Sequence, residues 1–240
     1  MISRFFYPLP LPASGETQLP EALAHHAARV LRLRDGDPVI LFDGTGGEMP
    51  AVLRLRGKQC FAELQARRKV ERESPLRLVL VQALASGDKM DWIVQKAVEL
   101  GVAAVVPVQA ERSVLRLAGE RAAKRVEHWQ QVAVSACEQS GRNRVPLVAP
   151  ISGLRDYLAL PFQGRRLVLD PAATQRLLDV GRPEGEVHLL IGPEGGWSDD
   201  ELAACRSAGC AGMGLGPRVL RTETAGLAAV AALQTVWGDF

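Results

Sequence analysis

Cysteine and histidine are scarce in this sequence, and neither residue is grouped. The four cysteines are scattered and form no C-x-x-C pair, whereas zinc sites and disulfide frameworks both need cysteines at characteristic spacings. The four histidines are equally dispersed. The pattern argues against a metal site and a metal-dependent mechanism, and it favours a reduced, cytoplasmic setting.

Long apolar runs are missing as well. The longest helix-compatible run, residues 225–233, is far shorter than the roughly 18 residues that a membrane-spanning helix needs. Residues 1–7 lead directly into a proline-rich stretch and show no signal-peptide pattern. With 240 residues, of which 47% are hydrophobic and 23% charged, we expect a soluble protein of one large or two modest domains, with no membrane partner.

The common phosphate-binding motifs are also absent, since neither G-x-G-x-x-G nor G-x-x-x-x-G-K-[ST] occurs. Instead, two glycine-rich loops lie near the carboxyl end, at 192–196 and 212–216. Ser198 and Glu201 fit a capping box, so the first loop should join a strand to a helix. Glycine lets backbone approach a ligand closely, and such a layout suits a small ligand at the carboxyl end of a strand. Glu194 would repel a polyphosphate, which favours a cationic ligand or one bound through neutral edges.

The spacing of apolar residues predicts two kinds of structure. Near the amino end we expect a small barrel of short strands and one helix, which has Leu23, Ala27, Val30 and Leu31 on one face. After a polar linker at 71–75, strands and helices alternate, which predicts an α/β domain with a mostly parallel sheet. The expected strands are 4–7, 38–42, 49–56, 60–65, 76–84, 102–108, 145–149, 166–170 and 187–191, and the helices 20–33, 88–100, 118–140 and 222–237.

Charge is distributed unevenly along the chain. Residues 1–145 contain 21 Lys and Arg against 16 Asp and Glu, a net charge of +5, whereas residues 146–240 contain 8 against 11, a net charge of −3. A basic first part suits a protein that meets a polyanion there. The last helix, in contrast, is apolar on nearly all sides, so it must be buried within its own domain or against a second subunit.

Five segments, taken in order, resemble one family. They are QKAVELGV (95–102), ERSV (111–114), EQSGR (138–142), GPEGGWSDDEL (192–202) and LGPRVLRTETA (215–225). Together they are similar to the signature of the RsmE family of ribosomal RNA methyltransferases, within the SPOUT superfamily. The similarity runs from about residue 77 to the end, and a weaker similarity extends over the first 70 residues.

The resemblance implies a fold, an activity and partners. It implies a PUA-like RNA-binding β-barrel domain over 1–73 and a SPOUT methyltransferase domain with a deep trefoil knot over 74–240. It also implies a homodimer with the active site at its interface. The implied reaction is transfer of a methyl group from S-adenosyl-L-methionine to N3 of a uridine in 16S ribosomal RNA, with the small ribosomal subunit as partner. Such a transfer needs alignment of the donor and the acceptor rather than a metal.

The implied cofactor suggests a set of binding residues, drawn from the glycine loops and from the ends of nearby strands. Backbone groups of the two glycine loops can face the adenine edge and the amino-acid part of the cofactor, while apolar side chains cover the adenine. The expected set is Leu169, Asp170, Ile191, Gly192, Glu194, Gly195, Gly196, Leu215, Gly216, Val219 and Leu220.

Catalysis requires more than alignment, because uridine N3 carries a proton and is then a poor nucleophile. A base or a cation that stabilises the imide anion is needed. The candidate cations are Arg112, Arg142 and Arg221, and the candidate bases are Glu138, Glu194 and Glu223. Near a helix start, the dipole favours the charged form of Glu223 and weakens it as a base. The sequence leaves the choice open.

RNA contacts are expected in the basic first part, from Arg4, Arg29, Arg32 and Arg34. Two alternatives to the main hypothesis stay open. One is a SPOUT methyltransferase that acts on another RNA position, such as a ribose 2′-OH or a tRNA base. The other is a non-catalytic RNA-binding factor, although such a factor would have no use for the glycine loops and the RTETA segment.

Overall fold

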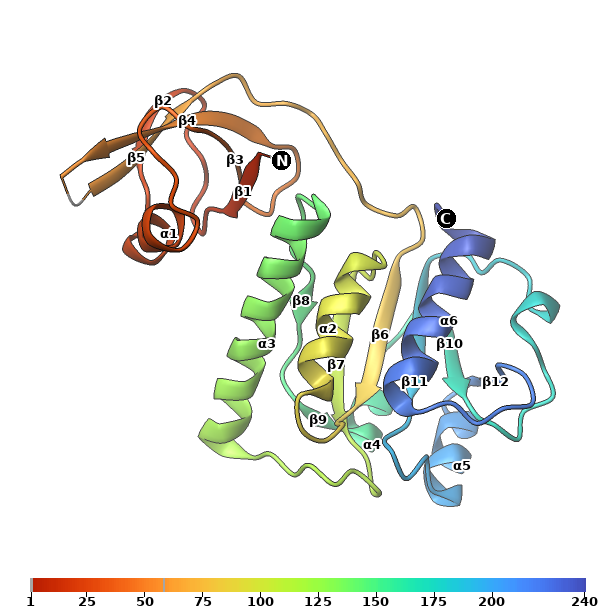
Figure 1. The fold of residues 1–240 in the computed structure, drawn as a ribbon. Coiled ribbons are helices and arrows are strands. Elements are labelled where there is room, and N and C mark those ends of the chain that lie inside the picture. The colour runs from red at the N-terminus through yellow and green to blue at the C-terminus, as the bar shows by residue number, and fades with distance from the viewer. Residues whose placement is uncertain (1, 58) are drawn as a thin grey trace. The chain divides into compact units, whose positions relative to one another are not determined.

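The computed structural model describes residues 2–57 and 59–240, which form two compact units (Figure 1). The first unit comprises Met1–Glu73 together with Cys137–Val145, and the second comprises Ser74–Ala136 and Pro146–Phe240. The domain limits expected from the sequence assign residues 137–145 to the second unit. In the structure this segment packs with the first unit, because its polar side chains have their hydrogen-bond partners there.

The first unit is built on a five-stranded sheet in the order β1-β3-β4-β5-β2. Only the β1–β3 pair is parallel. Tyr7, the residue directly after β1, shares a 2.9 Å hydrogen bond between its hydroxyl and that of Thr17 in β2. Phe5, Leu41 and Leu53 belong to the buried core of the unit. The strands are β1 (Ser3–Phe6), β2 (Gly15–Gln18), β3 (Pro38–Phe42), β4 (Met49–Arg56) and β5 (Gln59–Leu64).

The helix of this unit differs from its expected form. α1 (Glu21–His25) continues as a π-helical segment, η1 (His26–Val30), in which the Leu31 N–H donates to the His26 carbonyl at 3.0 Å. Ala27 is buried as expected, but Val30 and Leu31 are 58% and 43% exposed. The wider π-helical winding changes the rotation per residue, so these two side chains leave the face that a 3.6-residue period gives them.

The second unit contains a seven-stranded sheet in which every pairing is parallel, so the predicted α/β fold class is confirmed. The order is β12-β10-β11-β6-β7-β8, with β9 also paired to β7. β6 is buried along its whole length, as its continuous apolar sequence requires. The strands are β6 (Leu78–Ala83), β7 (Ala104–Gln109), β8 (Leu147–Val148), β9 (Ser152–Gly153), β10 (Gly164–Leu169), β11 (Glu186–Ile191) and β12 (Ala211–Met213).

Helices cover this sheet, and the last of them, α6, packs against α2, β6 and β11 (Figure 1). One face of α6 is fully buried through Ala229, Val230 and Leu233, but Ala228 and Val236 on the other side are exposed. No helix in the described part of the chain is long and apolar enough to cross a membrane. The helices are α2 (Lys89–Glu99), α3 (Gly119–Ser140), α4 (Leu154–Ala159), the short 3-10 helix η2 (Leu177–Asp179), α5 (Asp199–Ser207) and α6 (Thr222–Trp237).

Candidate functional site

The candidate site lies where three neighbouring strands of the second unit end. β12, β10 and β11 are adjacent and parallel, so their carboxyl ends lie at one edge of the sheet. β10 ends at Leu169, β11 ends at Ile191 just before the first glycine loop, and β12 ends at Met213, within the second. The carboxyl edge of a parallel sheet is the usual place for a ligand site in such folds.

Two cavities lie at this edge. The larger, of about 330 Å³, is formed by the first glycine loop and residues 219–222, while the smaller is formed by residues 169–171 and the second loop. Both are lined by Leu169, Pro171, Val219, Leu220 and Ala225. Each residue in the predicted cofactor-binding set lines at least one of the two cavities. The lining also includes residues that the sequence analysis did not single out, namely Lys89, Pro171, Pro193, Trp197, Met213, Arg218, Thr222 and Ala225.

A buried polar chain joins the first glycine loop to the start of α6. The Thr222 hydroxyl donates to the Gly192 carbonyl at 2.6 Å, and the Gln82 side-chain amide donates to the Thr222 oxygen at 3.0 Å. Gln82 is completely buried. A buried amide needs partners, so this chain fixes the relative position of the two segments. The sequence signal for it was a single glutamine in an otherwise apolar strand.

The capping box predicted after the first loop is confirmed. The Glu201 N–H donates to the Ser198 hydroxyl at 3.2 Å, and the Glu201 carboxylate accepts from the Ser198 N–H at 2.9 Å. The other Glu201 oxygen accepts from the Glu111 N–H at 2.8 Å. The buried carboxylate of Glu201 therefore caps the amino end of α5 and also anchors, through Glu111, the segment that carries Arg112.

Arg112 forms hydrogen bonds with backbone carbonyls in and just after the first glycine loop. Its Nη1 donates to the carbonyls of Gly195 and Trp197, each at 3.2 Å. A Cβ on Gly195 would lie 3.0 Å from the Arg112 Cβ, which is a close contact. This glycine therefore lets the arginine approach the loop backbone, and the arginine in turn braces the loop.

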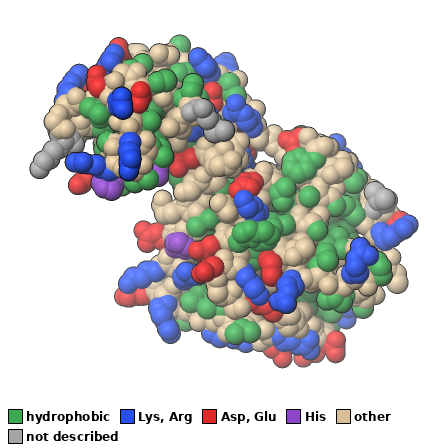
Figure 2. Space-filling view, viewed as in Figure 1, with side chains coloured by type: hydrophobic (Ala, Val, Ile, Leu, Met, Phe, Trp, Pro, Cys, Tyr) green, Lys and Arg blue, Asp and Glu red, His purple; other side chains and the backbone are tan. Residues whose placement is uncertain are grey.

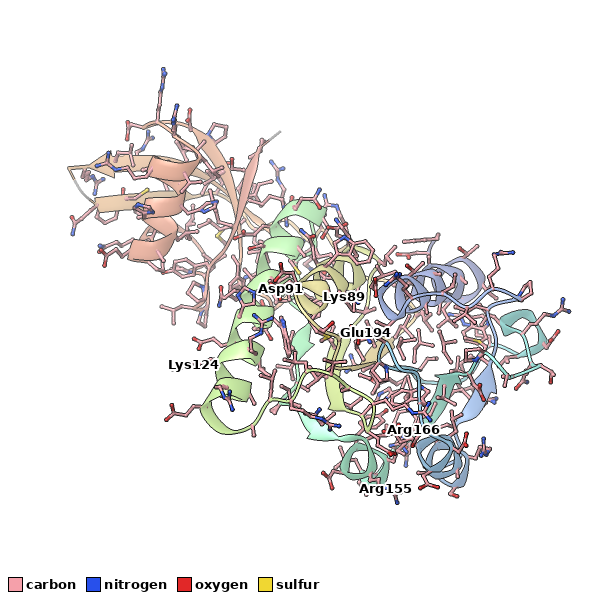
Figure 3. All side chains as sticks on the ribbon, turned by 60° about the horizontal axis from the view of Figure 1, so that its bottom comes forward. Lys89, Asp91, Lys124, Arg155, Arg166 and Glu194 are labelled. Atoms are coloured by element: carbon pink, nitrogen blue, oxygen red, sulfur yellow. The ribbon has the colours of Figure 1, made fainter. Side chains whose placement is uncertain are left out.

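Glu194 is held as a fixed anion. Its Oε1 accepts from the Ser86 N–H at 2.9 Å, from the Ser86 hydroxyl at 2.7 Å and from the Lys89 ammonium at 3.0 Å. Burial acts to raise the pKa of Glu194, but these hydrogen bonds outweigh it and lower the pKa to about 2. A carboxylate with so low a pKa is a poor base. Figure 3 shows Lys89 and Glu194 next to each other in this region.

Two buried polar atoms near the larger cavity have no hydrogen-bond partner among the described residues. One is the indole Nε1 of Trp197, a residue that lines the cavity, and the other is Glu223 Oε2, which lies 3.9 Å from the Nζ of the lining residue Lys89. Unsatisfied buried acceptors and donors are costly, so they favour a ligand that supplies the missing partners. Val219, at the mouth of both cavities, is 81% exposed and offers an apolar surface to the same ligand. Arg221 lines the larger cavity as the N-cap residue of α6.

The remaining predicted residues have partners elsewhere. Glu138 accepts from the Phe6 N–H at 2.9 Å, and Arg142, which is 4% exposed, pairs with Glu73 through Nη2 at 2.5 Å. Arg4 Nη1 pairs with Glu48 at 2.6 Å and its Nη2 donates to Asn143 Oδ1 at 2.5 Å. All these partners belong to the first unit.

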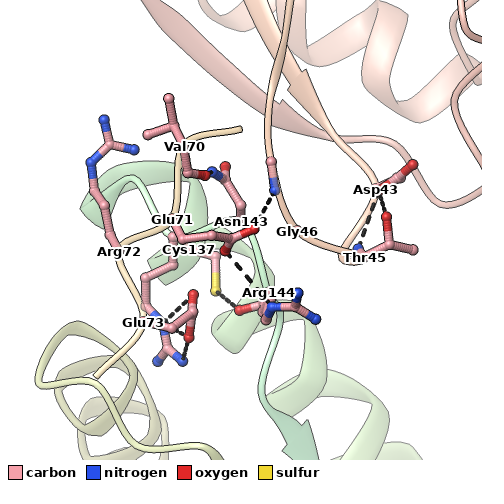
Figure 4. Close-up of polar contacts among 12 residues, drawn as sticks. Asp43, Thr45, Gly46, Val70, Glu71, Arg72, Glu73, Cys137, Asn143 and Arg144 are labelled. Carbon is pink, nitrogen blue, oxygen red and sulfur yellow. Dashed lines mark hydrogen bonds and ion pairs between the residues drawn. The ribbon is translucent and has the colours of Figure 1, made fainter. Parts of the chain in front are cut away.

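Figure 4 shows part of this arrangement, including Asn143 beside Val70 and the Glu73 ion pair. These hydrogen bonds and ion pairs give the EQSGR segment a structural role that its sequence did not reveal. They also engage the guanidinium of Arg4. The Arg4 side chain is 11% exposed and is paired with Glu48, which argues against the RNA contact expected for it. Among the described residues, no cluster of His, Cys, Asp and Glu could hold a metal ion.

Comparison with known proteins gives these features a context. Residues 72–234 match the family described as an RNA methyltransferase domain, and residues 19–65 match an RNA methyltransferase PUA domain. The chain is 35% identical over 254 residues to ribosomal RNA small subunit methyltransferase E of Mycobacterium bovis, which covers 99% of this chain and 94% of that one.

Two solved structures are similar over their whole length. One is ribosomal RNA small subunit methyltransferase E from Neisseria gonorrhoeae bound to S-adenosyl methionine, with 42% identity, a TM-score of 0.94 and complete coverage of both chains. The other is a methyltransferase from Legionella pneumophila in complex with the same cofactor, with 35% identity, a TM-score of 0.95 and complete coverage of both chains. With its parallel sheet, its PUA-like first unit and its two glycine loops, the chain belongs to the ribosomal RNA small subunit methyltransferase E family.

Proposed function

We propose that this protein transfers a methyl group from S-adenosylmethionine to N3 of a uridine in the 16S ribosomal RNA of the small ribosomal subunit. The observation that carries the proposal is the convergence of the two glycine loops and the start of α6 on one pair of cavities. The names of its relatives support a small-subunit RNA substrate, and two of the solved relatives hold S-adenosylmethionine. A substrate of this kind implies a cytoplasmic location.

The residues of the cavities fit this cofactor. The exposed Val219 and the adjoining Leu220 and Leu169 provide apolar walls for an adenine ring. The unpartnered Trp197 indole N–H suits a carboxylate, and the unpartnered Glu223 oxygen suits an ammonium group or an imide N–H. When bound, the cofactor supplies an electrophilic methyl group on a sulfonium. The contribution of the chain is to hold that group in line with the acceptor nitrogen.

The proton on uridine N3 must leave when the new bond to carbon forms. Glu194 is unsuited to accept it, because its pKa is about 2 and its Oε1 already accepts three hydrogen bonds. Glu223 has an oxygen without a partner and lies next to Lys89. The dipole at the start of α6 weakens Glu223 as a base, but its unpartnered oxygen distinguishes it from Glu194 and Glu138, so we assign proton acceptance to Glu223. Lys89 and Arg221 stabilise the negative charge that develops on the imide oxygens.

The other predicted catalytic residues take supporting roles in this proposal. Arg112 braces the glycine loop through the carbonyls of Gly195 and Trp197. Glu138 and Arg142 are assigned to the packing of the first unit rather than to chemistry, because both are engaged there. Phosphate contacts are assigned to Arg29, Arg32 and Arg34, all of which are exposed.

We further propose a homodimer, as the family resemblance implies. The open side of α6 carries Ala228 and the 42% exposed Val236, and the neighbouring α2 carries Trp92, which is 45% exposed. Exposed apolar side chains on adjacent helices favour a protein partner. Val236→Glu should lower the molar mass found by light scattering to that of one chain, while Leu147→Glu, a change at another exposed apolar position, should leave the dimer intact. The trefoil knot stays a prediction.

The activity is tested by incubating the protein with labelled S-adenosylmethionine and either naked 16S RNA or small ribosomal subunits, then mapping the modified nucleoside. N3-methyluridine is the expected product. A ribose methyl would support a different acceptor, and cofactor binding without transfer would support a non-catalytic factor. Lys89→Met should reduce the rate of transfer by about 10²-fold or more. Lys124→Met, at an exposed lysine on α3, is the matched control and should not.

A further inference from the structure

The first unit contains a cavity of its own, larger than the two at the edge of the parallel sheet. It has a volume of about 600 Å³ and lies between α1 with η1 on one side and strands β4 and β5, with the end of β2, on the other. We call it the α1–β5 groove. The residues used below are Gln18, His25, Ala28, Arg29 and Gln59, all of which line it. None of them belongs to the cavities at the edge of the parallel sheet.

Three arginines with no ion-pair partner in the described ranges lie in or near the groove. Arg29 lines it, and Arg32 and Arg34 lie in the segment that follows η1, all three with exposed side chains. Within residues 2–57 and 59–240, none of the three guanidinium groups has an ion-pair partner, in contrast to the Arg54–Glu63 and Arg56–Glu16 pairs of the same unit. Figure 2 shows histidine side chains at the surface of this unit beside basic and hydrophobic ones.

Arg32 occupies an unusual backbone position. Its φ is +55°, and it is the one non-glycine residue with a positive φ in the described part of the chain. It ends η1, where the Leu33 N–H donates to the Ala27 carbonyl at 3.0 Å. Glycine is the residue that usually fills such a helix end, because it has no Cβ to clash. An arginine there carries a conformational cost, which favours a use for its side chain.

Two apolar side chains stand beside this arginine. Val30 and Leu31 are 58% and 43% exposed as a result of the π-helical winding. Arg29 lines the groove, and the chain that follows it carries exposed apolar and cationic side chains on one segment. Single-stranded nucleic acid presents these two features at once, as phosphates and as the faces of unstacked bases.

We infer that the α1–β5 groove binds an unpaired nucleotide of the RNA substrate, with its phosphates on Arg29, Arg32 and Arg34. The inference rests on the proposed function and names a second contact with the same RNA. The volume accommodates a base, and Gln18, Gln59 and His25 offer donors and acceptors to its edge. A duplex does not place a base in such a groove, because its bases are paired and stacked. Proteins recognise double-stranded RNA mostly by the shape of its wide, shallow minor groove.

The first test separates a binding role from a structural one at Arg32. In the full-length protein, Arg32→Gly should leave the melting temperature unchanged or raise it, because glycine adopts a positive φ without strain. The same change should weaken binding of a single-stranded uridine-containing RNA about threefold or more. It should also reduce the slope of log K against log salt by about 0.7, the value for one lost phosphate contact. A lower melting temperature with unchanged RNA binding would overturn the inference.

The second test fills the groove without changing charge. Ala28→Trp should weaken binding of single-stranded RNA about tenfold and leave the salt slope unchanged, because the arginines remain. Ala22→Trp is the matched control on an exposed position of α1 outside the groove, and it should bind as the wild type does. Equal binding by Ala28→Trp and the wild type would refute the groove as the site.

Two further measurements separate the possible failures. Affinity for S-adenosylmethionine is measured for every variant and should not change, since the groove lies outside the cofactor cavities. If the wild type binds single-stranded RNA with these dependences but transfers no methyl group, the proposed function fails and the groove assignment stands. Competition by a duplex RNA or an acidic peptide as strong as that by single-stranded RNA would overturn the assignment.

Discussion

Replacing Glu201 by alanine is expected to affect both stability and cofactor affinity. This carboxylate is 7% exposed and accepts two backbone hydrogen bonds, from Ser198 at 2.9 Å and from Glu111 at 2.8 Å. Bonds to a charged acceptor contribute about 1.5–3 kcal/mol each, so the lower bound for losing both is ~3 kcal/mol. For a unit of this size, ~3 kcal/mol corresponds to a fall in melting temperature of about 6–12 °C.

The second consequence is local to the site. Without Glu201, the segment at Glu111 loses its anchor, and Arg112 no longer braces the glycine loop. The affinity for S-adenosylmethionine should therefore fall. Titration calorimetry at a temperature where the variant is folded measures this affinity. Asp200→Ala is the matched control, because Asp200 lies in the same helical turn but is exposed. It should cost about 0.3–1 kcal/mol through the helix dipole. An E201A variant that melts within about 2 °C of the wild type and keeps its affinity would refute the reasoning.

Three further changes test other parts of the structure. Gly214→Ala places a Cβ 2.6 Å from the Ala173 carbonyl oxygen and should weaken cofactor binding about tenfold, whereas Gly181→Ala, which meets nothing within 4 Å, should not. Glu194→Gln should destabilise the protein near pH 7. Because the folded pKa of about 2 is below the ordinary 4.5, the wild-type advantage should shrink as the pH falls from 4.5 toward 2 in chemical denaturation, and a constant difference would count against it. Asn143→Leu removes bonds to Arg4 and Val70 and should cost ~2 kcal/mol or more, measured by urea unfolding.

Local patterns in the sequence predicted much of the fold. The near-continuous apolar run of β6 predicted a strand buried on both faces, and the S-x-x-E spacing at Ser198 predicted the start of α5. Both depend on neighbours within a few residues, so a linear pattern carries the information. β2, β9 and β12 were not predicted, because they are short and have little apolar alternation.

The site was predictable in part. The glycine loops pointed to the two cavities at the edge of the parallel sheet, since glycine is required where backbone approaches a ligand. Lys89 was missed, because its role depends on contacts with Glu194 and Glu223, which are more than 100 residues away in the chain. For the same reason, a motif could not distinguish Glu138, which accepts a hydrogen bond from Phe6, from a catalytic base.

The sequence by itself determined most of the strands and helices, the capping box, the two glycine loops and the family to which the chain is similar. Tertiary structure alone decided that β12 pairs with β10 and not with its predecessor β11, that residues 137–145 pack with the first unit, and that η1 turns Val30 and Leu31 to the surface. The physical reason is that periodicity and capping act over a few residues. The partners of buried charges and edge strands are chosen among all segments that folding brings together.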